Sequence, residues 1–192
     1  YKVTNRYIGE YLVNILNALY TNAYFPDVWT RSLIMPLPKK GDLSQPENYR
    51  GISLLPIFSK IFTHVLKERL LKWCDTNRLI CDEQAGFRKN YCTMDNVFII
   101  DTIIRKYLRK KGGRFYCAFI DFSKAFDSVN HEALWEKLIG CNMSTRMLKM
   151  LISIYNKVCA AVLTNRGLSS TFNCEIGVKQ GCFIANSVQP FC

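Results

Sequence analysis

The sequence contains no apolar run long enough to cross a bilayer, and its first residues lack the charged-then-apolar order of a secretory signal. It has only two histidines, and no two of its cysteines are spaced as Cys-x-x-Cys. No internal repeat or low-complexity linker interrupts it. These absences argue against a membrane protein and a zinc knuckle. They favour a soluble intracellular protein.

The nine cysteines are odd in number and widely scattered, so a disulfide framework is not predicted either. Cys117 and Cys159 lie inside apolar runs, where we expect small buried side chains rather than reactive thiols. His64 and His131 have no other metal-ligating residues grouped around them in the sequence. We expect both histidines to be structural.

Composition and charge narrow the class of protein. The 192 residues are 49% hydrophobic and 21% charged, which is typical of a globular chain. Lys and Arg number 26 against 15 Asp and Glu, which gives a net charge of +11 and predicts a polyanionic partner. Nucleic acid and an anionic membrane surface both fit this charge. The chain begins at Tyr1 and stops at Cys192 without a terminating signal, which is typical of a fragment.

Apolar residues at helical spacing predict three helices, over residues 7–22, 58–73 and 97–108, each with a core-facing stripe. Residues 32–38 are apolar and contain two prolines, which predicts an edge strand before the polar turn of residues 39–51. The third helix ends in the basic stretch 105–114. A solvated helix end and a contact with a nucleic-acid backbone explain this stretch equally well.

The next segment carries the charges of greatest interest. Phe115–Ile120 is apolar without alternation and predicts a buried strand, followed by a helix over residues 129–138 with Asn130 near its N-cap. Residues 157–165 and 171–177 predict a hairpin around Gly167. Asp121 follows the predicted strand directly, so its carboxylate would have the rigid support that a metal ligand requires.

A simpler interpretation is that Asp121 and Asp127 cap the following helix or pair with Lys124, and spacing alone favours it. The residues Asp-Phe-Ser at 121–123 are similar to the Asp-Phe-Gly of protein kinases. No glycine-rich loop and no His-Arg-Asp loop accompany them, so a kinase is excluded.

An ordered set of motifs decides against the simpler interpretation. These are PLPKKGD (36–42), PENYRGISLLP (46–56), DEQAGFRK (82–89), YCAFIDFSKAFDSVNH (116–131) and GVKQGC (177–182). In this order they resemble a reverse transcriptase of the non-long-terminal-repeat retrotransposon type, from about Phe25 to Cys182. The resemblance implies an α+β fold with the fingers of a right-hand polymerase in residues 1–114. Residues 115–192 would form an incomplete palm, an antiparallel sheet backed by helices.

The resemblance also implies roles for individual residues. Asp121 matches the first catalytic aspartate, which binds Mg²⁺, and the Phe122 carbonyl matches a further ligand of the metal. Phe126 matches the steric gate that excludes the ribonucleotide 2′-hydroxyl, although an ordinary core phenylalanine is the alternative. The remaining matches are Arg50, Lys39 and Lys40 with the incoming triphosphate, Gln180 and Gly181 with nucleotide and template, and Arg88 with the template.

Departures from the family pattern bear on activity. After Cys182 the family continues with Leu-Ser-Pro, whereas FIANSVQPFC follows here, and the chain contains no Asp-Asp pair. The resemblance therefore implies a reverse-transcriptase fragment without its second carboxylate motif and without a thumb. Its partners would be RNA template, DNA primer and deoxynucleoside triphosphates. We expect this fragment to be inactive alone, and a basic RNA- or DNA-binding remnant or a relic without function is the alternative.

Overall fold

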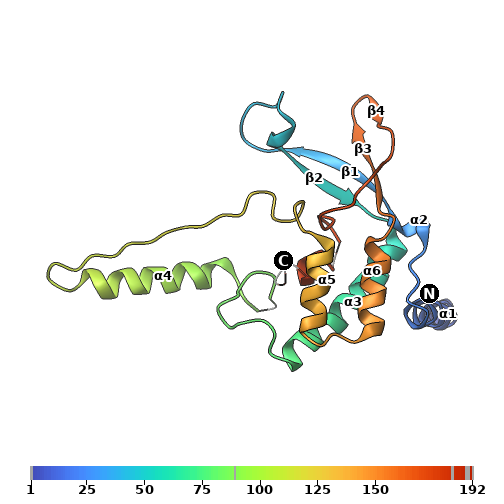
Figure 1. Cartoon of the computed structure of the whole chain (residues 1–192), viewed down its shortest axis with the longest axis horizontal. Coiled ribbons are helices and arrows are strands. Elements are labelled where there is room, and N and C mark those ends of the chain that lie inside the picture. Colours follow the sequence, from blue (N-terminus) through green and yellow to red (C-terminus); the bar gives the residue numbers. More distant parts are fainter. Residues whose placement is uncertain (1, 89, 183, 189–190, 192) are drawn as a thin grey trace.

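The computed structural model describes residues 2–88, 90–182, 184–188 and 191 (Figure 1). Its helices are α1 (Lys2–Thr21), α2 (Asp27–Thr30), α3 (Ile57–Thr76), α4 (Thr93–Leu108), α5 (His131–Gly140), α6 (Thr145–Tyr155) and α7 (Ala185–Val188), with a 3₁₀ turn η1 (Pro46–Asn48). Its strands are β1 (Arg31–Pro38), β2 (Tyr49–Leu54), β3 (Cys159–Thr164), β4 (Gly167–Leu168) and β5 (Phe172–Asn173). The predicted α+β class is confirmed.

The strands form one small sheet that meets the cluster of helices at one end (Figure 1). Its order is β2-β1-β3-β4, with β5 also beside β3. The predicted hairpin is present, because β3 pairs with β4 and β5 in antiparallel fashion. The strands within residues 115–192 pair only in antiparallel fashion, whereas β1, from the first part of the chain, runs parallel to β3. This parallel pair joins the two halves of the chain.

The prediction that residues 32–38 form an edge strand is wrong, because β1 lies between β2 and β3. Its prolines explain how this is possible. β3 pairs only with Arg31–Ile34, so Pro36 and Pro38 lie where β1 pairs with β2 alone. A proline has no N–H to donate, and here the side that lacks it faces no strand of the described chain.

The core lies between α3, α5, α6 and α7, as the predicted stripe of α3 requires. Phe62, Leu66 and Leu70 of α3 are each 1% exposed, and Leu138 of α5 is fully buried. The predicted N-cap is confirmed, since Asn130 Oδ1 accepts a hydrogen bond from the Ala133 N–H at 3.1 Å. None of the described helices is long and apolar enough to cross a membrane.

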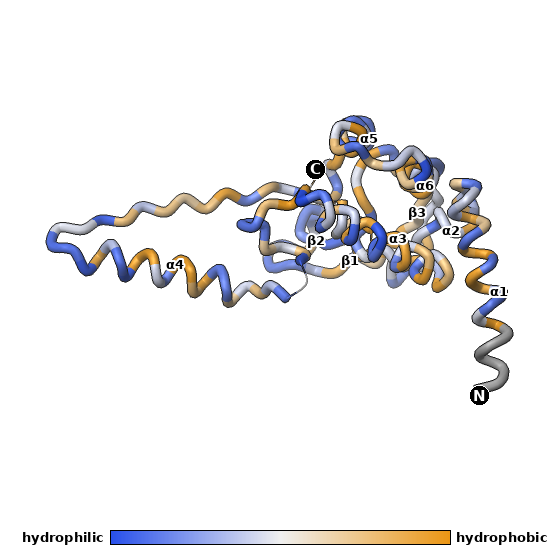
Figure 2. The backbone as a smooth tube through the Cα atoms, turned by 90° about the horizontal axis from the view of Figure 1, so that it is seen from below, coloured by the Kyte–Doolittle hydropathy of each residue, from blue (hydrophilic) through white to orange (hydrophobic). Residues whose placement is uncertain are grey.

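α4 and the extended segment that returns from it form an arm, residues 93–122, that projects from the body of the molecule (Figures 1 and 2). The prediction that α4 carries a core face is wrong, because no residue of the helix is buried. Val97 is 55% exposed and Leu108 is 56% exposed. Helical spacing of apolar residues predicted the helix correctly, but it does not show what packs against the helix.

Residues 115–120, predicted as a buried strand, are extended without being a strand and are mostly exposed. Phe119 is 82% exposed and Ile120 is 84% exposed. Cys117, predicted as buried, is exposed as well. The reason is that no strand of the described chain pairs with this segment, so its backbone N–H and C=O groups have no ladder to join.

We expect amide hydrogen exchange to distinguish the arm from the body. α3 and α6 have buried faces, whereas α4 has none, and opening of a helix without tertiary contacts costs little free energy. Exchange measured by mass spectrometry should be slow in α3 and α6 and fast throughout residues 93–122. Protection of α4 equal to that of α3 would contradict the projecting arm.

Candidate functional site

The turn before α5 is bound to the segment of residues 177–181 by a set of backbone hydrogen bonds. The Val178 N–H donates to the Phe126 carbonyl at 2.7 Å, and the Gly177 N–H donates to the Val129 carbonyl at 2.8 Å. His131 Nε2 donates to the Gly177 carbonyl at 2.7 Å, which confirms a structural role for this histidine. Two of the sequence motifs therefore form one rigid joint.

Gly177 permits this joint to close. Its φ is +84°, in the left-handed region that residues with a Cβ rarely adopt. A Cβ at this position would lie 2.8 Å from the Asp127 carbonyl oxygen and 3.0 Å from the Asp127 Cα. Both neighbours are backbone atoms, so they cannot move aside as a flexible side chain could.

The same segment continues onto β2. The Ser53 N–H donates to the Gln180 carbonyl at 2.9 Å, and a Cβ on Gly181 would lie 2.8 Å from the Ser53 carbonyl oxygen. Gln180 Nε2 donates to Asp127 Oδ1 at 3.5 Å. The simpler interpretation that Asp127 caps the next helix is wrong, because Asn130 is the cap and the Asp127 carboxylate accepts from Gln180.

A pocket of about 320 Å³ opens where these elements meet. Its polar side chains come from β1 and β2, from the turn before α5 and the first residue of α5, from the end of α6, and from residues 174–180. The lining includes Ser32, Gly51, Ser53, Asp127, His131 and Gln180. An amide, a carboxylate and hydroxyls facing one cavity can bind a polar ligand by hydrogen bonds.

Lys179 also lines this pocket, and sequence reasoning assigned it no role. It is half-buried, and its Nζ donates to the Thr30 carbonyl at 2.6 Å. Burial lowers the pKa of the Lys179 ammonium, although the nearby Cys182, Cys174 and Cys159 thiols act in the opposite direction. The only feature of the sequence that could have pointed to Lys179 is its position inside the motif of residues 177–182, directly before Gln180.

We expect Lys179 to make stability depend on pH. Its folded pKa is lower than the ordinary 10.5, so the unfolded chain binds more protons between the folded pKa and 10.5. Stability from this group therefore rises with pH across that window, and Lys179→Met should abolish the rise. Urea unfolding of both proteins at several pH values between 7 and 10.5 measures the difference.

The wild-type chain has to be compared with Lys179→Met, because the buried thiols change the stability with pH in the direction opposite to Lys179. Burial raises the pKa of the Cys74 thiol to about 12 and also raises the pKa of the Cys182 thiol. Native thiols then hold their protons above pH 9, and stability from them falls. Because this fall occurs in both proteins, parallel pH profiles for the two would show that Lys179 does not titrate as proposed.

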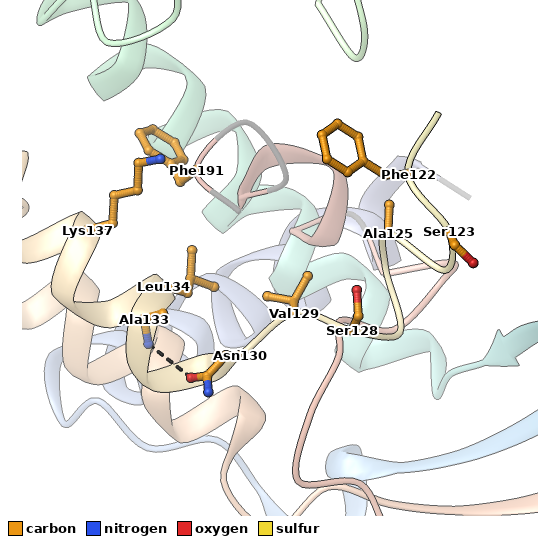
Figure 3. A pocket seen from close by; sticks show the side chains of 10 residues that line it. All are labelled: Phe122, Ser123, Ala125, Ser128, Val129, Asn130, Ala133, Leu134, Lys137 and Phe191. Carbon is orange, nitrogen blue, oxygen red and sulfur yellow. Dashed lines mark hydrogen bonds between the residues drawn. The ribbon is translucent and has the colours of Figure 1, made fainter. Parts of the chain in front are cut away.

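Asp121 and Phe122 lie apart from this pocket, on the returning segment of the arm. Asp121 is exposed, and Phe122 lines a second pocket of about 450 Å³ on the other side of the turn. Figure 3 shows Phe122 and Lys137 at opposite sides of this pocket, with Val129 and Leu134 between them. Its floor is apolar, and Ser123, Ser128 and Asn130 contribute polar groups.

The described residues do not fit a two-ion magnesium site. Such a site requires several hard oxygen ligands close together, and no three His, Cys, Asp or Glu side chains of the described chain converge. Asp121 could supply one carboxylate. The other ligands would have to come from residues outside the described chain.

The other predicted residues are distributed over the surface of the sheet and the turns. Arg50 is exposed on β2, and because side chains alternate along a strand it lies on the face opposite to Gly51 and Ser53. Lys39 Nζ donates to the Glu47 carbonyl at 3.2 Å, and Lys40 is exposed. The structure therefore does not bring these three cations to Gln180.

Phe126 and Arg88 have contacts within the protein. The Phe126 ring meets the Phe87 ring edge-on, with centroids 5.9 Å apart, and packs beside the core. Arg88 Nη1 donates to the Cys81 carbonyl at 3.1 Å, and its guanidinium lies 4.7 Å from the centre of the Tyr91 ring. The Phe87–Phe126 contact links this loop to the turn that precedes α5, whereas the Arg88 contacts lie within the loop.

Comparisons with known proteins follow the same motifs. Residues 37–189 match the protein family described as "Reverse transcriptase (RNA-dependent DNA polymerase)". The matched range continues past Cys182, where the recognised motifs end, to residue 189. The helix α7 and the buried Ile184 lie in this continuation.

Curated proteins give the same result. The chain is 30% identical over 175 residues to "Probable RNA-directed DNA polymerase from transposon X-element" of Drosophila melanogaster, which is 89% of this chain and 19% of that protein. It is 30% identical over 172 residues to "RNA-directed DNA polymerase from mobile element jockey" of Drosophila funebris, again 89% of this chain and 19% of the relative. The chain thus spans about a fifth of the length of these relatives.

Proposed function

This chain belongs to the reverse transcriptase family, and from that premise we propose that it forms the fingers and the first part of the palm of an RNA-directed DNA polymerase. Residues 1–114 are the fingers region and residues 115–192 are the palm region. The reaction of the complete enzyme is the template-directed addition of deoxynucleotides to a primer 3′-hydroxyl. Its partners are an RNA template, a DNA primer and deoxynucleoside triphosphates.

The observation that carries this proposal is the joint between distant motifs. Phe126, Gln180 and Ser53 belong to three different motifs, and backbone hydrogen bonds connect all three. Such a joint positions the turn and β2 around the pocket of about 320 Å³, with Gly181 allowing the backbones to approach closely. In this proposal Phe126 is the steric gate beneath the sugar.

In the active enzyme, with nucleotide bound and the rest of the palm present, the charged residues would complete the proposed site. Arg50, Lys39 and Lys40 would approach the triphosphate, for which a planar guanidinium and two ammonium groups are suited. Asp121 and the Phe122 carbonyl would hold Mg²⁺ together with carboxylates from the remainder of the palm. Since the described residues supply no such set, we expect the isolated chain to be inactive.

A binding function without catalysis is the second candidate, and one observation favours it. The net charge of +11 would attract a nucleic-acid backbone whether or not the metal ligands are complete. Primer extension in the presence of Mg²⁺ separates the candidates. It should be run on the chain alone and on a chimera that continues from Gly181 with the palm and thumb of the X-element relative.

Extension by the chimera and not by the isolated chain is the expected result. A chimera that folds and binds primer-template but does not extend it would contradict the polymerase proposal. It would leave binding as the function. Binding of primer-template by neither protein would contradict both candidates.

A further inference from the structure

The far end of the arm, residues 105–116, carries a concentration of positive charge that neither pocket uses. This arm tip contains six cations and no acidic residue. All six are exposed, and they are Arg105, Lys106, Arg109, Lys110, Lys111 and Arg114. Asp101 pairs with Arg105 alone, so most of the charge is not neutralised by the ion pairs of the described chain.

Aromatic rings lie among these cations. The Tyr107 and Phe115 rings are 6.4 Å apart with 32° between their planes, and Lys110 Nζ lies 5.6 Å from the centre of the Tyr107 ring. Tyr107 is 46% exposed and Tyr116 is 82% exposed. Flat groups such as unpaired bases can stack on exposed aromatic rings.

The tip is a turn that contains a backbone hydrogen bond. α4 ends at Leu108, and the Gly113 N–H donates to the Lys110 carbonyl at 2.8 Å. This bond closes the turn and brings Phe115 back beside Tyr107. Because the arm projects from the body, a long polymer could reach the tip without entering either pocket (Figures 1 and 2).

We propose that the arm tip is a binding site for single-stranded RNA, separate from the site proposed for polymerisation. Cations contact the phosphates, while Tyr107 and its neighbouring ring stack on unpaired bases. A double helix keeps its bases stacked on one another, so an interleaved set of rings and cations favours a single strand.

The distribution of charge along α4 argues against an anionic membrane as the partner. A helix that lies on such a membrane carries cations along its polar face. The first three turns of α4 contain Asp95 and Asp101 and no Lys or Arg, and all cations lie at one end. Anionic lipid would repel the larger part of the helix.

The test compares two triple variants of the full chain with equal changes in charge. Lys110→Gln, Lys111→Gln and Arg114→Gln alter the tip, and Arg146→Gln, Lys149→Gln and Lys157→Gln alter exposed cations on the body. Binding of a fluorescent single-stranded RNA of random sequence is measured by anisotropy between 50 and 200 mM salt. Circular dichroism checks that both variants fold.

The tip variant should reduce the slope of log Kd against log salt by about 2, since each phosphate contact with a single strand contributes about 0.7. The body variant should leave the slope nearly unchanged. Equal effects of the two variants would overturn the proposal. So would RNA binding that the tip variant leaves intact while it loses binding to vesicles that contain phosphatidylserine.

A second variant tests the stacking. Tyr107→Ala should weaken RNA binding about fivefold or more, whereas Tyr107→Phe should retain affinity, because a ring of either kind can stack. Unchanged affinity of Tyr107→Ala would overturn this part of the site. The measurement contains no deoxynucleoside triphosphates and requires no polymerisation, so it remains informative even if the chimera shows no polymerase activity.

Discussion

In the chimera that restores the palm and thumb, Asp121→Asn is expected to reduce primer extension on the order of a thousandfold. The change removes a charged, hard oxygen at the residue that we propose as the first catalytic aspartate. Loss of such charge stabilisation costs several kcal/mol of the activation barrier. Asp121 is exposed, so the substitution should not alter the stability of the fold.

Asp127→Asn is the matched control, with the same change of charge in the same turn. The Asp127 side chain accepts a hydrogen bond from Gln180 at 3.5 Å, and an asparagine oxygen can accept it too. We expect a loss of about tenfold at most, which corresponds to a single hydrogen bond. If Asp127→Asn is as severe as Asp121→Asn, or if Asp121→Asn leaves extension intact, the assignment of Asp121 is wrong.

Gly177→Ala is expected to destabilise the native protein by about 2–4 kcal/mol. Alanine would have to adopt a φ of +84°, and its Cβ would press on the Asp127 backbone at 2.8 Å. Relief would require breaking the hydrogen bonds from Gly177 to Val129 and from Val178 to Phe126. Urea unfolding followed by circular dichroism measures the loss.

Gly167→Ala separates the two causes. Gly167 also has a positive φ, +118°, but a Cβ there would have no neighbour within 4 Å. Gly167→Ala therefore measures the free-energy cost of the positive φ alone, without a steric clash. A loss of stability no greater for Gly177→Ala than for Gly167→Ala would show that the joint accommodates a Cβ.

The elements that the sequence predicted correctly are those that local rules specify. The periodic apolar residues of α3 and the Asn130 cap of α5 are properties of a few neighbouring residues. The hairpin around Gly167 is local in the same sense. For these elements, the residues that set the conformation are also those that pack or pair.

The predictions that failed concern partners distant in sequence. Residues 115–120 have the composition of a buried strand, and α4 has the spacing of a core helix, but apolar character does not supply a neighbour. Similarly, the two prolines of β1 suggested an edge, although Arg31–Ile34 pairs with β3. A sequence pattern identifies residues that can be buried or paired, but only the fold determines which residues pack against them.

For the candidate site, motif order located the residues but not their geometry. The contacts of Gln180 with Asp127 and Ser53 could not be predicted, because they join segments that have no local relation. Lys179 was missed for a related reason. Its burial depends on Thr30, which lies 149 residues away in the sequence.

The parallel pairing of β1 with β3 has a consequence for how the chain folds during synthesis. Ser32 Oγ donates to the Cys159 carbonyl at 3.4 Å across this pair, and the two residues lie 127 positions apart in the sequence. A ribosome needs roughly 6 to 25 s to add that many residues, and closing so long a loop costs about 4 kcal/mol of chain entropy. β1 can pair with β2 early, but its other edge has no partner until β3 emerges, so the nascent chain exposes an unpaired strand edge while the residues between β2 and β3 are made.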